Sequence, residues 1–233
     1  MSLKQAEILG VNVNSLTMVQ AVEKVQQFID ERKNALVATA NAEMLMRATQ
    51  DEELKHILNS ADLVVPDGAG TVWAANYLGV EMPERVAGYD LAQELMREAP
   101  GRGDRIYFFG SAPGVAESAR EKAMELYPGI KIVGTRNGFF SEADEPEIIA
   151  EIKAARPDIL LAALGVPKQE KWLYKYRQEL QVPVAIGVGG TLDVMAGVMQ
   201  RAPLWMQKAK LEWLFRGLKQ PSRAGRLLAL PKF

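Results

Sequence analysis

The segment DILLAALG, residues 158–165, is apolar at every position after its first residue and has the length of one β-strand. A helix is expected directly after it, over 168–179, with Pro167 at an early helical position. A strand with no polar position is buried on both faces, which is typical of a parallel sheet covered by helices. This stretch therefore predicts an α/β fold.

Other apolar runs of strand length alternate with helical patterns in the same way. Further strands are expected over 7–13, 35–40, 62–65, 105–110, 130–135 and 182–190. Helices fit 42–59, 69–78, 88–98, 114–127 and 144–155, after a first helix that Thr17 and Gln20 would cap. We expect one α/β domain over 1–200, with a Rossmann-like, mostly parallel sheet and helices on both faces. A C-terminal helical appendage would follow over 201–233.

The composition is that of an ordinary globular protein, with 233 residues, 48% of them hydrophobic. The chain has no cysteine, which excludes disulfides, thiolate metal sites and cysteine nucleophiles. No segment has the length and apolarity of a signal peptide or a membrane-spanning helix. We therefore expect a cytoplasmic protein.

The net charge of −1 conceals a strong asymmetry. Residues 201–233 carry eight Lys and Arg and a single acid, Glu212, for a net charge of +7. Residues 1–200 carry 20 basic and 28 acidic residues, for a net charge of −8. A basic segment on an acidic body indicates that this segment has an anionic partner.

On a helical wheel the basic segment has one apolar stripe, made of Leu204, Leu211, Phe215 and Leu218, with Leu214 at its edge. Trp205 and Trp213 fall outside the stripe, among basic residues. The stripe alone is explained by packing on the α/β body. Tryptophan beside basic side chains is typical of an anionic membrane surface. We expect peripheral membrane attachment through residues 201–233.

Small and polar residues follow five of the expected strands, where ligands bind in open α/β sheets. These segments are 39–41, 66–68, 110–114, 165–169 and 187–193. Several of them lead into a helix N-terminus, where free N–H groups favour an anion. Together they predict a nucleotide or another phosphorylated ligand.

Several ligand motifs are absent from the sequence. GVGGTLD (187–193) departs from the dinucleotide fingerprint, and there is no Walker A sequence, no G-x-S-x-G and no H-E-x-x-H. No D-x-D pair offers a carboxylate cradle for a metal-bound diphosphate. We expect no metal and no cofactor, so that helix ends with Arg or Lys would neutralise a diphosphate.

A general base would have to be a carboxylate, since the single histidine, His56, lies in a charged helical stretch. Asp67 and Asp193 are the acids that stand beside glycine-rich strand ends. Asp67 fits an Asx-turn or a helix N-cap as well as it fits a catalytic role. Arg85 fits a phosphate ligand or a surface ion pair, and Gln169 fits a sugar ligand or a polar position in a first helical turn.

Seven segments of the sequence together resemble the WecG/TagA/CpsF glycosyltransferase family, over essentially the whole chain and in the family's order. They are ATANAE (38–43), ADLVVPDGAG (61–70), RVAGYDL (85–91), FFGSAPG (108–114), ALGVPKQEKW (163–172), GVGGTLDVMAG (187–197) and RAPLWMQKAKLEWLFRGLKQPSR (201–223). The resemblance implies an inverting enzyme on the inner face of the plasma membrane. It would move N-acetylmannosamine, or a related sugar, from UDP to undecaprenyl-diphosphate-N-acetylglucosamine, for teichoic acid or another surface polysaccharide.

The resemblance also implies roles for individual residues. Asp67 would be the catalytic base, and Thr39, Asn41, Arg85 and Gln169 would belong to the same active site. The substrates would be bound by Gly110, Ser111, Gly165, Lys168, Gly189, Gly190 and Asp193, and by three arginines of the appendage, Arg216, Arg223 and Arg226.

Three other functions compete with this interpretation. Nucleic-acid binding would explain a basic segment with aromatic residues, but the body is acidic and carries no nucleic-acid motif, so we expect no nucleic-acid partner. A nicotinamide oxidoreductase would fit a Rossmann-like sheet, but the fingerprint is missing. A non-catalytic UDP-sugar-binding protein would keep the phosphate loops and would not need Asp67. The sequence also leaves a homo-oligomer open.

Overall fold

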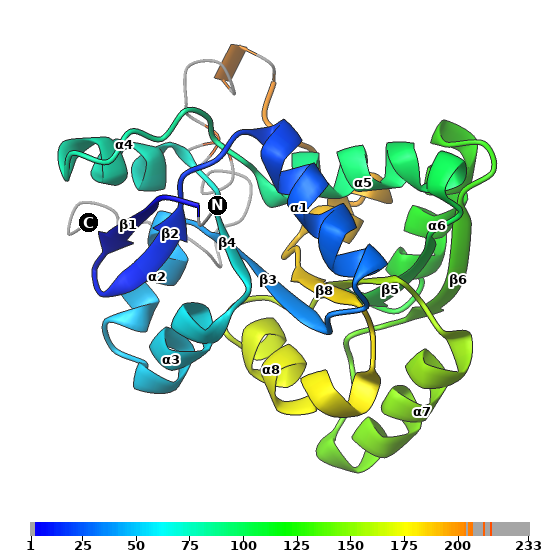
Figure 1. The fold of residues 1–233 in the computed structure, drawn as a ribbon. Helices are drawn as coiled ribbons and strands as arrows, with labels where there is room; N and C mark the ends of the chain where they lie inside the picture. Colours follow the sequence, from blue (N-terminus) through cyan, green and yellow to red (C-terminus); the bar gives the residue numbers. More distant parts are fainter. Residues whose placement is uncertain (1–2, 204, 207–211, 213–214, 216–233) are drawn as a thin grey trace.

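A six-stranded sheet forms the centre of the computed structural model, which describes residues 3–203, 205–206, 212 and 215 (Figure 1). The strands are β3 (Ala35–Ala40), β4 (Leu63–Pro66), β5 (Arg105–Gly110), β6 (Lys131–Arg136), β7 (Ile159–Ala163) and β8 (Val184–Gly187). Their order in space is β4-β3-β8-β7-β5-β6, and every neighbouring pair is parallel. The predicted parallel α/β sheet is confirmed.

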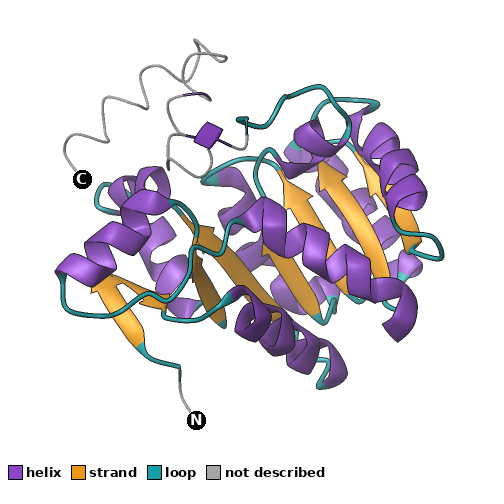
Figure 2. Cartoon of the chain, turned by 90° about the horizontal axis from the view of Figure 1, so that it is seen from above, coloured by secondary structure: helices purple, strands orange, loops and turns teal. Residues whose placement is uncertain are grey.

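Helices cover both faces of the sheet (Figures 1 and 2). One face carries α1 (Met18–Asp30), α5 (Gly88–Arg102), α6 (Val115–Leu126) and α9 (Thr191–Met195). The other carries α2 (Ala42–Ala48), α3 (Glu52–Ser60), α7 (Glu145–Ala155) and α8 (Lys168–Leu180). A further helix, α4 (Ala69–Tyr77), follows β4, and a short 3-10 helix, η1 (Glu142–Asp144), precedes α7.

Strand β7 shows why the segment 159–165 is apolar at every position. Ile159 and Leu161 pack into the core beneath α1, α5 and α6, whereas Leu160 packs into the core beneath α7 and α8. All three side chains are fully buried. Burial of each contributes about 1.5–3 kcal/mol to stability, so a polar residue on either face of this strand would be costly.

The prediction of one strand over 7–13 is wrong. The chain forms a hairpin there, with β1 (Gln5–Ile8) antiparallel to β2 (Val11–Asn14). The two residues between the strands, Leu9 and Gly10, have φ angles of 53° and 80°. Two consecutive positive φ angles make the tight turn that reverses the chain of a hairpin.

The prediction of one helix over 42–59 is also wrong, because α2 and α3 are separate helices. Asp51 begins the second one, where its carboxylate accepts a hydrogen bond of 3.0 Å from the Leu54 N–H. This bond and the neighbouring Lys171 lower the pKa of Asp51. The expected capping box of the first helix is confirmed, since Thr17 and Gln20 each accept a bond from the other's backbone N–H.

The chain leaves the sheet after β8 through α9, where the sequence predicted a longer strand over 182–190. Most of the predicted appendage lies outside the described residues, so the domain boundary at residue 200 and the helical appendage stay predictions. Trp205 is described and is 65% exposed, whereas Trp213 and the leucines of the predicted stripe lie outside the described residues. None of the helices among the described residues has both the length and the apolarity to cross a membrane.

Candidate active site

The parallel arrangement brings the carboxyl ends of all six strands to one edge of the sheet. Asp67 lies at this edge, immediately after β4, and it is partly exposed. Its N–H donates to the carbonyl oxygen of Ala40 at the end of β3, at 3.0 Å. The Thr71 hydroxyl donates to the same carbonyl oxygen, also at 3.0 Å. The N–H of Asp67 is thus held by the end of β3, and its carbonyl oxygen accepts a longer hydrogen bond of 3.5 Å from the Thr71 hydroxyl.

Gly68 starts α4 and has a φ of 105° and a ψ of 153°, a conformation that is essentially restricted to glycine. A Cβ atom at this position would lie 3.7 Å from the Cβ of Asn41. The structure thus brings Asn41 and Asp67 together, from the ends of two neighbouring strands. Asn41 also caps α2, because its Oδ1 accepts a hydrogen bond of 2.9 Å from the Met44 N–H.

Thr39 lies below the surface of this edge, with 5% of its area exposed. Its hydroxyl donates to the carbonyl oxygen of Gly187 at 2.9 Å and so connects β3 to the end of β8. Its methyl group faces Gly88 at the start of α5, where a Cβ atom would approach it to 2.9 Å. In this structure Thr39 supports the edge from beneath, and its predicted contact with a substrate stays a prediction.

Gln169 is buried in the first turn of α8, with 1% of its area exposed. Its Oε1 accepts hydrogen bonds from the N–H groups of Gly165, at 3.1 Å, and Gly189, at 3.2 Å. The side chain therefore ties the loop after β7 to the loop after β8. Gly187 packs against this side chain, since a Cβ atom there would lie 2.6 Å from Gln169 Nε2.

The neighbouring Glu170 is a functional candidate that the sequence did not reveal. It is 1% exposed, and its Oε1 accepts a hydrogen bond of 2.7 Å from Gln169 Nε2. Burial raises its pKa from the ordinary value of 4.5 to about 7, against the opposing effects of the Gln169 hydrogen bond and a backbone hydrogen bond. Its place in the charged motif PKQEKW is typical of a solvent-exposed helix residue. It is buried because α8 packs against β8.

This raised pKa predicts a loss of stability as the pH rises. The folded protein binds the Glu170 proton more tightly than the unfolded chain, so the stabilisation is complete below about pH 4.5 and is lost as the pH passes 7. Its size is about 3 kcal/mol. Glu170→Gln has no proton to lose at this position. Between pH 5 and pH 8 we therefore expect its free energy of unfolding to rise by about this much relative to that of the wild type. Urea unfolding at both pH values checks this, and an unchanged difference between the two proteins would contradict it.

A further group of predicted residues lies where β5 and β8 end. Ser111, which follows β5, donates from its hydroxyl to the carboxylate of Asp193 at 3.1 Å. Gly110 ends β5 beside Ala163 of β7. Gly190, the N-cap of α9, is close to Asp193, whose Oδ2 would lie 3.8 Å from a Cβ atom at position 190.

Lys168 lies beside this group of residues at the ends of β5 and β8. It donates to the carbonyl oxygen of Gly138 at 3.2 Å and stands 3.9 Å from the centre of the Phe140 ring. The N–H of Gly138 in turn donates to the carbonyl oxygen of Ser111, at 2.8 Å. Lys168 is thus connected through Gly138 to the Ser111 loop, which the sequence predicted to bind the same ligand.

Arg85 takes part in a cluster of four charges beside the end of β4. The next residue, Val86, donates from its N–H to the Pro66 carbonyl oxygen at 3.0 Å, which places Arg85 near the Asp67 loop. Arg85 forms an ion pair with Glu212 and lies 3.8 Å from Asp90.

Arg201 completes this cluster. It holds both carboxylate oxygens of Asp90, at 2.6 and 2.8 Å, and donates to Glu212 at 3.2 Å. Burial would raise the pKa of Glu212, but the hydrogen bonds and charges of Arg85 and Arg201 outweigh it and lower that pKa. The cluster joins two parts of the chain that spacing in the sequence could not connect, since Arg85 and Glu212 are 127 residues apart.

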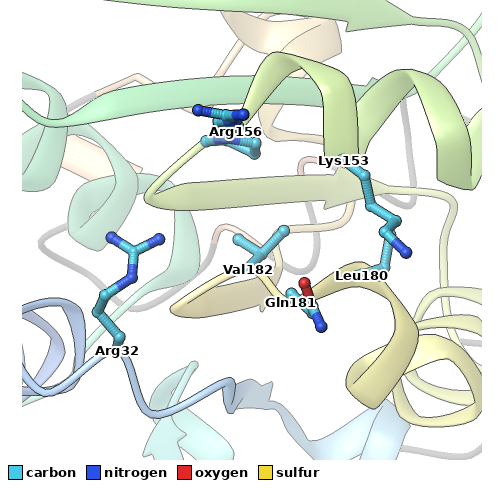
Figure 3. A pocket seen from close by; sticks show the side chains of 7 residues that line it. Arg32, Lys153, Arg156, Leu180, Gln181 and Val182 are labelled. Carbon is cyan, nitrogen blue, oxygen red and sulfur yellow. The ribbon is translucent and has the colours of Figure 1, made fainter.

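A pocket of about 260 Å³ lies at the opposite edge of the sheet, near the amino ends of β7 and β8 (Figure 3). Arg32, Lys153 and Arg156 give it a cationic lining. The C-termini of α1, α7 and α8 meet there, and cations at helix C-termini are ordinary partners of the helix dipole. The lining thus has a structural explanation, and the carboxyl edge remains the better candidate for a site.

The remaining residues that the sequence predicted to bind a substrate are not among those that the structure describes. Arg216, Arg223 and Arg226 lie outside the described residues. Within the described part of the chain, no group of three or more His, Asp or Glu side chains could hold a metal ion. His56 is exposed on α3 and lies 3.2 Å from the Tyr174 hydroxyl, as expected for a surface residue.

Comparison with known proteins gives one consistent result. The model of the glycosyl transferase WecG/TagA/CpsF family matches residues 6–233. The relatives include three proteins named N-acetylglucosaminyldiphosphoundecaprenol N-acetyl-beta-D-mannosaminyltransferase. The one from Bacillus spizizenii is 37% identical and covers 88% of this chain and 79% of its own. Those from Bacillus subtilis strain 168 and Staphylococcus aureus strain MW2 are 34% and 32% identical, covering 96% and 98% of this chain and 86% and 90% of their own.

Proposed function

Because this chain belongs to the WecG/TagA/CpsF family of glycosyltransferases, we propose that it transfers an N-acetyl-β-D-mannosaminyl group to N-acetylglucosaminyl-diphosphoundecaprenol. The observation that carries this proposal is the similarity, over most of the chain, to relatives named for that reaction. The donor in this proposal is a UDP-linked sugar, and the product feeds teichoic acid or another surface polysaccharide.

The proposed reaction is a single displacement at the anomeric carbon of the donor. The acceptor hydroxyl attacks this carbon, the bond to the diphosphate of UDP breaks, and Asp67 takes the hydroxyl proton. A general base of this kind contributes about 10²- to 10⁴-fold to the rate. The configuration at the anomeric carbon is inverted, and no covalent intermediate is needed. The position of Asp67 at the carboxyl edge, with its backbone fixed by Ala40, supports this role.

In this proposal the departing diphosphate binds at the loops after β5, β7 and β8. Gly165 and Gly189 are held by Gln169, and Ser111 is held by Asp193. The N-termini of α6 and α8 lie at the same edge and add positive potential. Together with basic side chains this stabilises the developing charge without a metal ion.

The appendage supplies further basic side chains in this proposal. Arg201 and Glu212 are held beside the end of β4 by Asp90 and Arg85. Glu212 therefore lies next to the proposed site, and Arg216 follows it four residues later in the sequence. This supports the assignment of Arg216, Arg223 and Arg226 to the substrate phosphates, although all three lie outside the described residues.

We further propose that the protein attaches to the inner face of the plasma membrane through the same segment. Residues 216–233 carry five basic residues and no acid. Each basic residue near an anionic surface contributes about 1 kcal/mol. A truncation after Phe215 keeps Arg201 and Glu212 in place. We expect it to lose binding to vesicles that contain anionic lipid, measured by co-sedimentation, and undiminished binding would contradict the proposal.

The proposed function is tested by an assay of UDP release. The protein is mixed with UDP-N-acetylmannosamine, with and without a lipid-diphosphate-N-acetylglucosamine acceptor. We expect release of UDP that depends on the acceptor, with transfer of the sugar to it. UDP-sugar binding without any transfer would instead indicate a non-catalytic binding protein.

A further inference from the structure

The first turn of α8 contains a buried carboxyl group that the proposed reaction does not use. Glu170 Oε1 accepts one hydrogen bond, from Gln169 Nε2 at 2.7 Å. Its other oxygen, Oε2, is buried and has no hydrogen-bond partner in the described part of the chain. A buried polar atom without a partner costs free energy, so its presence needs an explanation.

The neighbouring amide explains what the carboxyl does. Gln169 Oε1 faces two N–H groups, those of Gly165 and Gly189, and only an oxygen can accept from both. The Nε2 group must then point the other way, towards Glu170. The carboxyl oxygen is the acceptor that this NH₂ group needs once the amide is in that orientation. Glu170 thereby holds the amide of Gln169 in a single orientation.

Gly187 packs closely against this pair of side chains. A Cβ atom on Gly187 would lie 3.0 Å from Glu170 Oε1 and 2.6 Å from Gln169 Nε2. The carbonyl oxygen of Gly187 also accepts the hydrogen bond from Thr39. The pair therefore connects the loops after β7 and β8 and packs against Gly187, which Thr39 ties to β3, all at the candidate active site.

We propose that Glu170 is a positioning residue, which fixes the amide of Gln169 and through it holds the loops of Gly165 and Gly189 in the geometry that binds the diphosphate of the donor. This inference rests on the proposed function for the identity of the ligand. Glu170 itself is 1% exposed and acts through Gln169 instead of touching a substrate. The role needs only an accepting oxygen, which a glutamine also offers.

The test compares Glu170→Met with Glu170→Gln. Methionine fills a similar volume without an acceptor, and glutamine retains one. In Glu170→Met we expect the backbone amides of Gly165 and Gly189 to exchange their hydrogens about tenfold faster, measured by NMR. We expect the Kd for UDP, measured by calorimetry, to rise about tenfold, the size of one hydrogen bond of about 1.4 kcal/mol. Glu170→Gln should restore both values to within about threefold of the wild type.

A double-mutant cycle separates positioning from a general loss of stability. If Glu170 acts through Gln169, Glu170→Met should weaken UDP binding no further in a Gln169→Met background. Asp104→Leu is the control, because it removes a buried carboxylate at the opposite edge of the sheet. It should lower the unfolding temperature and leave UDP affinity unchanged.

The outcomes distinguish this inference from the proposed function. Wild-type exchange rates and UDP affinity in Glu170→Met would overturn the inference, as would losses that add in the double variant. A wild-type protein that binds no UDP would overturn the proposed donor and the ligand assigned to these loops. The exchange rates of Gly165 and Gly189 would still decide whether Glu170 holds them.

Discussion

Asp67→Asn is expected to lower kcat by about 10²- to 10⁴-fold, the contribution of a general base. Asparagine has nearly the shape of aspartate and can still accept hydrogen bonds, but it cannot take a proton from the acceptor hydroxyl. Asparagine keeps both backbone bonds of position 67, the one from its N–H to Ala40 and the one from the Thr71 hydroxyl to its carbonyl oxygen, so the loop should keep its conformation. The Kd for UDP should stay within about twofold of the wild type, because the proposed diphosphate loops belong to other strands.

The control for this variant is Asp104→Asn. Asp104 is a buried carboxylate at the amino end of β5 and pairs with Arg102 at 2.9 Å. It should affect stability and leave kcat unchanged. Full transfer activity in Asp67→Asn would remove Asp67 from the mechanism. A parallel loss of UDP binding would indicate that Asp67 binds the donor instead of activating the acceptor.

The second large effect is expected from Gly187→Ala. The new methyl group would lie 2.6 Å from Gln169 Nε2 and 3.0 Å from Glu170 Oε1, both closer than atoms in van der Waals contact. The Gln169 side chain cannot move away without breaking its bonds to Gly165 and Gly189. We expect a loss of about 1–3 kcal/mol in stability and a rise of tenfold or more in the KM for the donor.

Gly101→Ala is a matched control for this substitution. Gly101 lies inside α5, and a Cβ atom there would meet nothing within 4 Å. Alanine should therefore stabilise the helix by about 0.5–1 kcal/mol without any effect on the donor KM. Thermal unfolding and steady-state kinetics measure both variants. A donor KM for Gly187→Ala equal to that of the wild type would show that Gln169 and Glu170 do not shape the donor site.

The sequence predicted the parallel sheet well because its strands are buried on both faces and carry a strong apolar signal. It failed where the signal was local and weak. The turn of the β1–β2 hairpin begins at Leu9, a residue that seldom has a positive φ, so the apolar run over 7–13 concealed the reversal. The break between α2 and α3 contains neither glycine nor proline, and only the cap at Asp51 marks it.

The candidate site was predictable to the extent that its residues follow strands directly. Asn41 and Asp67 lie at the predicted edge of the sheet for this reason, and Gln169 lies there because the helix that follows β7 begins at that edge. The partners that hold the site could not be predicted, because they are brought together by tertiary packing. Glu170 reads as a surface acid until α8 is placed against Gly187, and Arg85 reads as an isolated cation until Glu212 is placed beside it.

The anomeric configuration of the reaction product is the most direct test of the mechanism centred on Asp67. Purified protein, a UDP-α-linked N-acetylmannosamine donor and the lipid-linked acceptor are incubated, and the new glycosidic bond is examined by NMR. A single displacement assisted by one base predicts a β-linkage, formed with inversion. A product with the α-linkage of the donor would require a two-step mechanism or a different catalytic group, and would contradict the role assigned to Asp67.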